Sequence, residues 1–207
     1  YRLVLERLAA FEPLDQADLM QAYAIECYAA GLLEHALSAQ QDVVRRRREL
    51  ADPSALGLGL RWLSRMYWWM GDPAAADASG AEAVAILEPT GDEHALAFAL
   101  NNQALLHSFA GRYFDAIPLA ERAATLARAV DDAGLLSHAL NNLGTSIWWS
   151  RGREHLEEAL QVGLAAGDTE AACRSYVNLG TLHIDMLRLD EAERTLDAGI
   201  TLADDTE

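Results

Sequence analysis

Apolar side chains recur along this chain at the spacing of one helix face, and the same short pattern returns about every forty residues. The pattern is clearest around Gly144, where Leu140, Leu143 and Ile147 lie three or four positions apart. A glycine within such a face predicts close approach by a neighbouring helix. Related segments lie at residues 20–27, 60–67, 100–107 and 176–183. Five copies at nearly constant spacing predict a repeat protein.

Turn residues divide each copy into two helices. We expect five helix pairs, at about residues 16–52, 55–89, 93–131, 133–168 and 170–204, and residues 1–12 as the second helix of a truncated repeat. In the fourth pair the turn is expected at Arg151 and Gly152. One pair alone cannot bury its apolar face, whereas stacked pairs share a continuous core. The sequence therefore predicts an all-α fold, with residues 1–207 as a single solenoid that is a fragment of a larger protein.

The composition narrows the possible functions. Of the 207 residues, 51% are hydrophobic, so the chain can bury a large core, and 32 acidic against 16 basic residues give a net charge of −16. All the basic residues are arginine. Contact with nucleic acid needs a basic surface, so we expect none by this segment. We also expect no membrane span, because no apolar run approaches the ~18 residues that one needs.

The residue patterns of catalysis and metal binding are missing from the sequence. Cys27 and Cys173 lie far apart and show neither a disulfide framework nor a zinc spacing, which favours a cytoplasmic location. The histidines show no metal-ligand spacing, and adjacent acids such as Glu157 and Glu158 point apart on a helix. We therefore expect no enzyme activity, no metal and no cofactor.

The helix pairs resemble tetratricopeptide repeats, in which a leucine precedes a small residue, a glycine forms the turn, and an alanine opens the second helix. The matching residues are Leu143–Gly144, Leu179–Gly180, Gly71 with Ala76, Gly111 with Ala116, and Leu189 with Ala192. Two features depart from the family: the spacing is about forty residues where the standard unit has about thirty-four, and Leu156 replaces the expected alanine. The resemblance implies a right-handed superhelical solenoid.

The forty-residue spacing and residues 61–65, 138–145 and 192–200 are similar to the helical-repeat region of large ATP-dependent LuxR-type bacterial transcription regulators. The resemblance implies a sensor and oligomerisation arm between a nucleoside-triphosphatase module and a helix-turn-helix module. The sequence has no G-x-x-x-x-G-K-[ST] stretch, so we assign no nucleotide binding to it.

In tetratricopeptide solenoids the first helices line the concave groove, so polar and aromatic residues beside their apolar face are candidate ligand contacts. Asparagine amides suit a peptide backbone, tryptophans supply contact area, and two arginines four apart suit a carboxylate or phosphate. The candidates are Arg61, Arg65, Trp68, Trp69, Asn101, Asn102, Asn141, Asn142, Thr145, Trp148, Trp149 and Asn178.

Each candidate set has a structural alternative. The tryptophans pack between repeats, the asparagines bond neighbouring repeats, or the arginine pair is neutralised by acidic residues. A second arginine run, residues 45–48, spreads over all sides of its helix, so we expect it to be solvated.

The sequence thus favours a non-catalytic binding module, the sensor or oligomerisation arm of a bacterial transcription regulator or signalling ATPase. Its partner is expected to be a protein, a peptide or a small-molecule effector. The alternative is a structural scaffold with an empty groove. Exposed apolar ends favour a homodimer.

Overall fold

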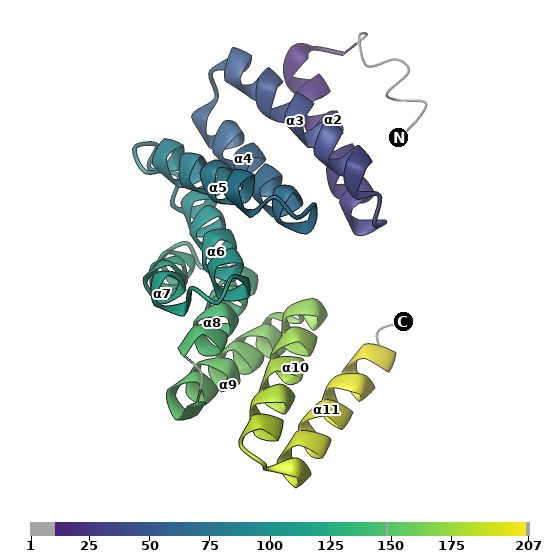
Figure 1. The fold of residues 1–207 in the computed structure, drawn as a ribbon, viewed down its shortest axis with the longest axis vertical. Coiled ribbons are helices and arrows are strands. Elements are labelled where there is room, and N and C mark those ends of the chain that lie inside the picture. Colours follow the sequence, from purple (N-terminus) through teal and green to yellow (C-terminus); the bar gives the residue numbers. More distant parts are fainter. Residues whose placement is uncertain (1–10, 148, 206–207) are drawn as a thin grey trace. The chain divides into compact units, whose positions relative to one another are not determined.

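The computed structural model describes residues 11–147 and 149–205, with the side chains of Trp149 and Ser150 excepted, and all ten elements in these residues are α-helices. Consecutive helices of the chain pack in pairs (Figure 1). Their bounds are α2 Pro13–Ala29, α3 Leu33–Leu50, α4 Pro53–Trp69, α5 Pro73–Leu87, α6 Glu93–Phe109, α7 Tyr113–Ala129, α8 Ala133–Ile147, α9 Trp149–Ala166, α10 Thr169–Asp185 and α11 Leu189–Asp204. The predicted all-α fold of five helix pairs is confirmed.

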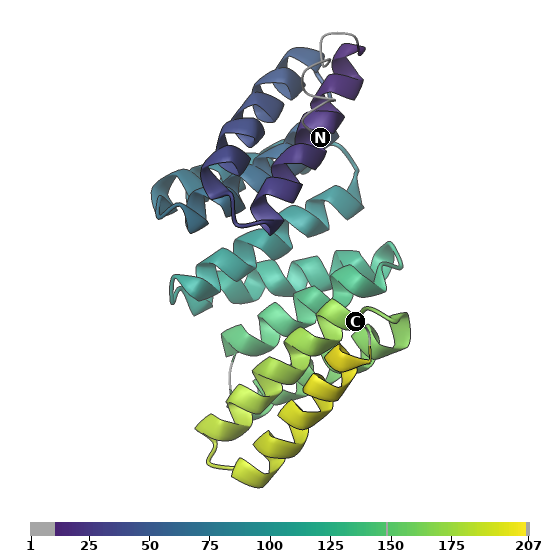
Figure 2. The same ribbon diagram turned by 90° about the vertical axis from the view of Figure 1, so that its right-hand side faces the viewer.

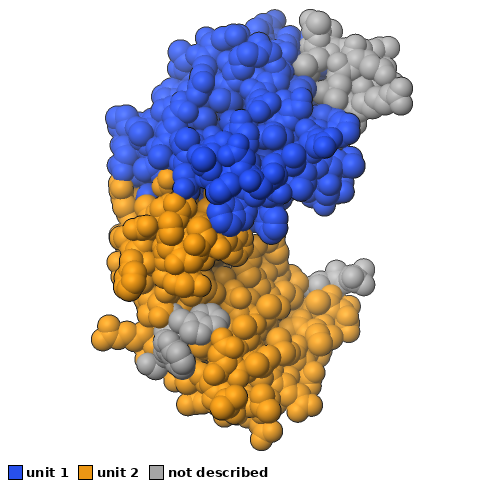
Figure 3. Space-filling model, viewed as in Figure 1, with its two compact units in different colours: residues 1–102 blue, residues 103–207 orange. Residues whose placement is uncertain are grey.

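The chain divides into two compact units, residues 1–102 and 103–207 (Figure 3). Their boundary falls inside α6, so α2 to α5 belong to the first unit and α7 to α11 to the second. A single solenoid over all 207 residues stays a prediction. Residues 1–10 of the expected N-terminal helix lie outside the described residues.

Aspartates fix the starts of the helices at the repeat spacing. The side chain of Asp52 accepts a hydrogen bond from the Ala55 backbone N–H (3.0 Å) at the start of α4. The side chains of Asp92, Asp132 and Asp168 accept the equivalent backbone hydrogen bond at the starts of α6, α8 and α10. Such a cap satisfies a backbone N–H that has no partner within its own helix, and it contributes about 1 kcal/mol. Part of the acidic excess therefore serves as helix caps.

In the first unit, α4 packs against the pair formed by α2 and α3. The fully buried Met66 of α4 lies in a core cluster with Ala24 and Cys27 of α2 and with Ala36 and Ala39 of α3. The small side chains on α2 and α3 let the three helices approach closely. This packing sets the rotation of α4 about its axis and thereby decides which of its polar residues stay at the surface.

In the second unit, a glycine contact joins α8 and α9. A Cβ atom on Gly144 would lie 2.8 Å from the Gly152 carbonyl oxygen and 2.7 Å from Cγ of Leu156. The predicted close approach at Gly144 is confirmed, and the buried Leu156 occupies the space that a side chain there would need. The turn predicted at Arg151 and Gly152 is wrong, because Gly152 lies inside α9 as the facing half of this contact.

The last pair of the second unit leaves apolar side chains at the surface. Helices α10 and α11 lie side by side in both Figure 1 and Figure 2. Val177, Ile184, Leu189 and Ile200 on these helices are each about half exposed or more. The sequence predicted association into a homodimer through the last helix and through the N-terminal helix, of which residues 1–10 lie outside the described residues, and the dimer stays a prediction.

The arginine run in α3 is not simply solvated, which corrects the sequence prediction. Arg47 is buried, and its guanidinium donates to Asp18 (3.2 Å), Gln21 (3.2 Å) and the Ala55 carbonyl (2.8 Å). The remaining three arginines pair with carboxylates on α3 and α5: Arg45 and Arg46 with Asp42, and Arg48 with Glu82. The run therefore joins helices within the first unit.

Candidate ligand-binding site

Arg61 and Arg65 lie one turn apart on α4, so their guanidinium groups share one face of that helix. Aromatic rings from three helices of the first unit surround them. The Arg61 Cζ atom lies 4.4 Å from the centroid of the Trp62 ring and 5.3 Å from that of Phe98 on α6. The Arg65 Cζ atom lies 5.9 Å from the ring centroid of Tyr28 on α2. Guanidinium groups stack favourably on such rings.

The aromatic walls are themselves packed together. The rings of Tyr28 and Trp62 meet edge to face, with centroids 5.7 Å apart and an angle of 67° between their planes. The rings of Phe98 and His94 also meet edge to face, with centroids 4.9 Å apart. These contacts fix the positions of the rings and therefore those of the two guanidinium groups between them.

Neither arginine forms an ion pair with a carboxylate among the described residues. Arg65 Nε donates a hydrogen bond to the Tyr28 hydroxyl at 3.1 Å. Arg61 Nε is buried without a hydrogen-bond partner, whereas neither its terminal nitrogens nor those of Arg65 belong to the buried unpartnered atoms. The predicted alternative, an arginine pair neutralised by acidic residues, is therefore not what the described residues show.

Burial, together with the nearby positive charge of Arg65, lowers the pKa of Arg61 to about 9. The hydroxyl of Tyr28 acts in the opposite direction. Both lowering effects mean that this environment disfavours the positive charge. An anion placed between the two guanidinium groups would offset both effects.

The asparagines predicted for the groove are mostly used between repeats. Asn102, Asn141 and Asn142 are each 2% exposed. In the second unit the Asn178 amide donates to Oδ1 of Asn141 at 3.0 Å, which joins α10 to α8. In the first unit the Asn102 amide lies 3.4 Å from the Arg61 carbonyl oxygen on α4. This geometry favours the alternative in which asparagines bond neighbouring repeats, and these residues are left out of the site proposed below.

The other predicted contacts vary in their access to solvent. Trp69 is 50% exposed, while Trp68 and Asn101 are half-buried. The Thr145 hydroxyl donates to the carbonyls of Asn141 and Asn142 in its own helix. Trp148 and the side chain of Trp149 lie outside the described residues. The structure thus places Trp68 and Trp69 on the same helix as the arginine pair.

The sequence interpretation missed Tyr28, which contacts both Arg65 and Trp62. A signal for it exists in the repeat spacing. Tyr28 precedes Trp68 by forty residues, so it occupies the equivalent position one repeat earlier. Extending the candidate columns into the first repeat would have identified it.

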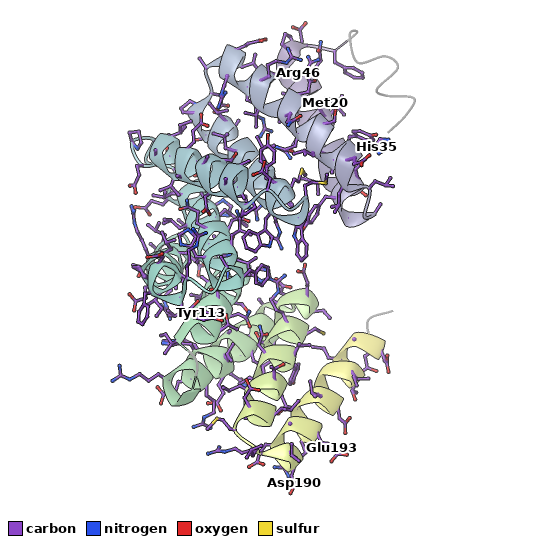
Figure 4. All side chains as sticks on the ribbon, in the orientation of Figure 1. Met20, His35, Arg46, Tyr113, Asp190 and Glu193 are labelled. Atoms are coloured by element: carbon purple, nitrogen blue, oxygen red, sulfur yellow. The ribbon has the colours of Figure 1, made fainter. Side chains whose placement is uncertain are left out.

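Other concave features lie elsewhere in the first unit. Met20 and His35, labelled in Figure 4, project from α2 and α3 and line a pocket of about 590 Å³. A second pocket, of about 610 Å³, lies over α3, α4 and α5 and is lined by Arg48, Tyr67 and Glu82. Neither pocket includes Arg61 or Arg65. Among the described residues no cluster of histidine, cysteine or acidic side chains is placed to hold a metal, and none of their helices has the length and apolarity to cross a membrane.

Comparison with protein families supports the interpretation of the helix pairs as repeats. Residues 57–129 match the tetratricopeptide repeat model. The model of anaphase-promoting complex subunit 5 matches two separate segments, residues 16–68 and 154–207. A model that matches twice is typical of a chain built from similar units. A comparison with curated proteins gives no match.

Solved structures share the fold at low sequence identity. A Rap protein complexed with competence and sporulation factor has a TM-score of 0.85 at 12% identity, over 98% of this chain and 57% of that one. BtubC from P. vanneervenii has a TM-score of 0.73 at 21% identity, over 99% of this chain and 85% of that one. A signal transduction ATPase (STAND protein) with a tetratricopeptide repeat sensor from Pyrococcus horikoshii has a TM-score of 0.74 at 17% identity. The match covers 91% of this chain and 29% of that one. The chain thus spans little more than half of the Rap protein, and the likeness establishes a tetratricopeptide-like helical solenoid.

Proposed function

We propose that this chain, in which residues 57–129 match the tetratricopeptide repeat model, is a non-catalytic module that binds a protein or peptide segment through its first helices. The observation that carries the proposal is the arginine pair on α4, which lies between aromatic rings and has no carboxylate partner among the described residues. Exposed Trp69 on the same helix adds contact area.

We further propose that the module is the sensor or oligomerisation arm of a cytoplasmic bacterial transcription regulator of the LuxR type, or of a signalling ATPase. Two fold neighbours support this proposal. One is a Rap protein complexed with a competence and sporulation factor, and the other is a STAND ATPase whose repeats are named as its sensor. Both are under 25% identical to this chain, so they support the proposal through the fold alone.

Panning a phage-displayed random peptide library on the purified protein tests the binding role. Two equally exposed aromatic residues make a matched pair: Trp69 at the end of a first helix (50% exposed) and Tyr113 at the start of a second helix (48% exposed). We expect enriched peptides to bind Trp69→Ser at least about 10-fold more weakly than the parent, because a large aromatic contact is lost. Tyr113→Ser should bind as the parent does.

Circular dichroism melting of both variants provides the control for folding. Equal melting temperatures with selective loss of binding in Trp69→Ser would support the first-helix surface. Loss of binding in Tyr113→Ser alone, or no peptide enriched above the level on an uncoated surface, would refute it.

The alternative function is a structural scaffold, and the exposed apolar side chains on α10 and α11 are the observation that favours it. Light scattering over a range of protein concentrations measures whether the protein forms a dimer. A stable dimer that persists after Ile200→Glu would argue against these helices as the interface.

A further inference from the structure

We propose that the pocket over α3, α4 and α5 is a second binding site, which takes an uncharged small molecule with an apolar body and a carbonyl group. The second helices α3 and α5 form its sides and buried leucines of α4 its floor, so it is separate from the first-helix surface described above. Its volume of about 610 Å³ lies within the range of small-molecule sites, about 300–1,000 Å³. The inference goes beyond peptide binding and does not rest on it.

The residues that line the pocket occupy one face of each helix. On α3 they run from Gln41 to Arg48 at the spacing of a helix face, and on α4 they include Leu60, Leu63 and Tyr67. Gln41 Nε2 donates a hydrogen bond to the Tyr67 hydroxyl at 3.0 Å, which joins α3 to α4. Gln41 and Arg48 lie about 10 Å apart along the helix. Packed helices, rather than a loop, therefore shape the pocket.

Charges around the pocket are balanced, although the chain as a whole has a net charge of −16. Arg45 pairs with Asp42 and lies 3.8 Å from Glu49, and Arg48 pairs with Glu82 across the pocket at 2.6 Å. A charged ligand would lose hydration here without meeting an unpaired counter-charge. The pocket therefore favours an uncharged ligand.

The interior combines an apolar floor with two available hydroxyl groups. Val44, Leu60 and Leu63 are each 6% exposed or less. The Tyr67 hydroxyl accepts one hydrogen bond but donates to none of the described residues, and the Ser79 hydroxyl makes no hydrogen bond to them. Neither oxygen is among the buried unpartnered atoms. A carbonyl oxygen accepts from such hydroxyls, while an apolar body covers the floor.

Ser79 explains why this repeat has room for a ligand. Positions 39, 79 and 119 are equivalent at the repeat spacing, and they hold Ala39, Ser79 and Leu119. Ala39 and Ser79 each line a pocket, whereas Leu119 packs against a core cluster that includes Ala104 and Leu143 in the second unit. A leucine is thus compatible with the fold at this position, and Ser79→Leu is a suitable variant for occupying the pocket.

Photocrosslinking with benzophenone tests the proposal on the full 207-residue chain. Benzophenone is uncharged, has two rings and a ketone, and attaches under ultraviolet light to C–H bonds beside its ketone. We expect saturable labelling of the α3 and α4 residues that line the pocket, located by mass spectrometry of proteolytic fragments. Diphenylmethane lacks the ketone, so it should block labelling only at about 3- to 10-fold higher concentration, as expected for loss of one hydrogen bond.

Protein variants complete the test. Ser79→Leu should weaken labelling of the pocket at least about 10-fold, because its side chain occupies the site. Ala78→Leu is the matched control, since it adds a leucine at the neighbouring exposed position of α5 and should label as the parent does. Tyr67→Phe should raise the half-saturating concentration about 3- to 10-fold through loss of one hydroxyl donor. Melting temperatures show whether a loss arises from unfolding, and Tyr67→Phe keeps the ring that packs in the fold.

Three results would overturn the proposal. Labelling that does not saturate, or that falls mainly outside α3, α4 and α5, would show that the pocket is not a binding site. Labelling that persists unchanged in a folded Ser79→Leu variant would show the same. Equal half-saturation in the parent and Tyr67→Phe, with diphenylmethane as effective as benzophenone, would overturn the choice of a carbonyl compound. Peptide binding through the first helices is measured separately by panning and is unaffected by any of these results.

Discussion

Replacing Arg61 by methionine tests whether the charge at this position destabilises the unliganded fold. A side chain selected to bind an external anion, rather than to stabilise the protein, should be replaceable with a gain in stability. Methionine is a suitable choice because it is unbranched, of similar reach, and able to contact aromatic rings through sulfur.

The expected magnitude follows from the contacts of Arg61. The substitution removes a guanidinium contact with Trp62 at 4.4 Å, worth about 1 kcal/mol. A new sulfur–aromatic contact, worth about 0.3–1.5 kcal/mol, offsets this loss. The substitution also removes a buried Nε without a partner, whose desolvation costs about 1–3 kcal/mol. The net expectation is a variant about 1 kcal/mol more stable, or a melting temperature higher by about 2–4 °C for a chain of this size.

The assay is thermal unfolding at low salt, followed by far-ultraviolet circular dichroism. The stability difference between the parent and Arg61→Met should change with pH in a defined direction. The pKa of Arg61 is lowered from 12.5 to about 9 in the fold, so between these values the unfolded chain binds more protons at this site than the folded chain does. The stability of the parent relative to the variant therefore rises with pH in this range. The advantage of Arg61→Met should be full below about pH 9 and should shrink above it.

Two results would refute this reasoning. A melting temperature lowered by several degrees would show that Arg61 stabilises the fold, and an advantage that is equal at about pH 7 and about pH 10 would show that its charge is not disfavoured. Arg48→Met is the control, because its exposed pair with Glu82 is worth only about 0–1 kcal/mol.

Three further predictions concern the fold. Gly152→Ala should lower the free energy of unfolding in urea by about 2 kcal/mol or more, because its Cβ would lie 2.5 Å from the Gly144 carbonyl oxygen; an unchanged midpoint would contradict the close contact. Arg47→Met should destabilise the fold by about 1–3 kcal/mol, since it leaves buried acceptors without a donor, while Arg48→Met should cost less than about 1 kcal/mol in the same assay. Leu187→Gly should raise the melting temperature by about 2–4 °C, because Leu187 has a φ of 57° and is 84% exposed; a lower melting temperature would show that its side chain packs.

Much of the local structure could be predicted from the sequence. The apolar spacing identified five helix pairs, and Gly144 predicted a close helix contact that the structure contains. Gly152 was misassigned to a turn because a glycine at the end of an apolar pattern is the usual helix terminator. Local sequence cannot distinguish that role from a glycine required by a facing helix.

The candidate site was only partly predictable. The helix period places Arg61, Arg65, Asn102 and Asn141 beside the apolar face of their helices, and the sequence treated them as equivalent. The structure separates them, because the asparagines are buried against a neighbouring repeat while the arginines lie among aromatic rings. Burial depends on the adjacent helix, whose position no residue of the same helix encodes.

The sequence by itself determined the helices, their pairing and the absence of an obvious catalytic motif, because these depend on residues close together in the chain. Tertiary structure decided which charges are neutralised. Arg47 finds its partners on α2 and at the start of α4, whereas Arg61 and Arg65 meet rings from α2 and α6. The physical reason is that an arginine reaches across to whichever helix packs beside it, so its partner is fixed only when the helices stack.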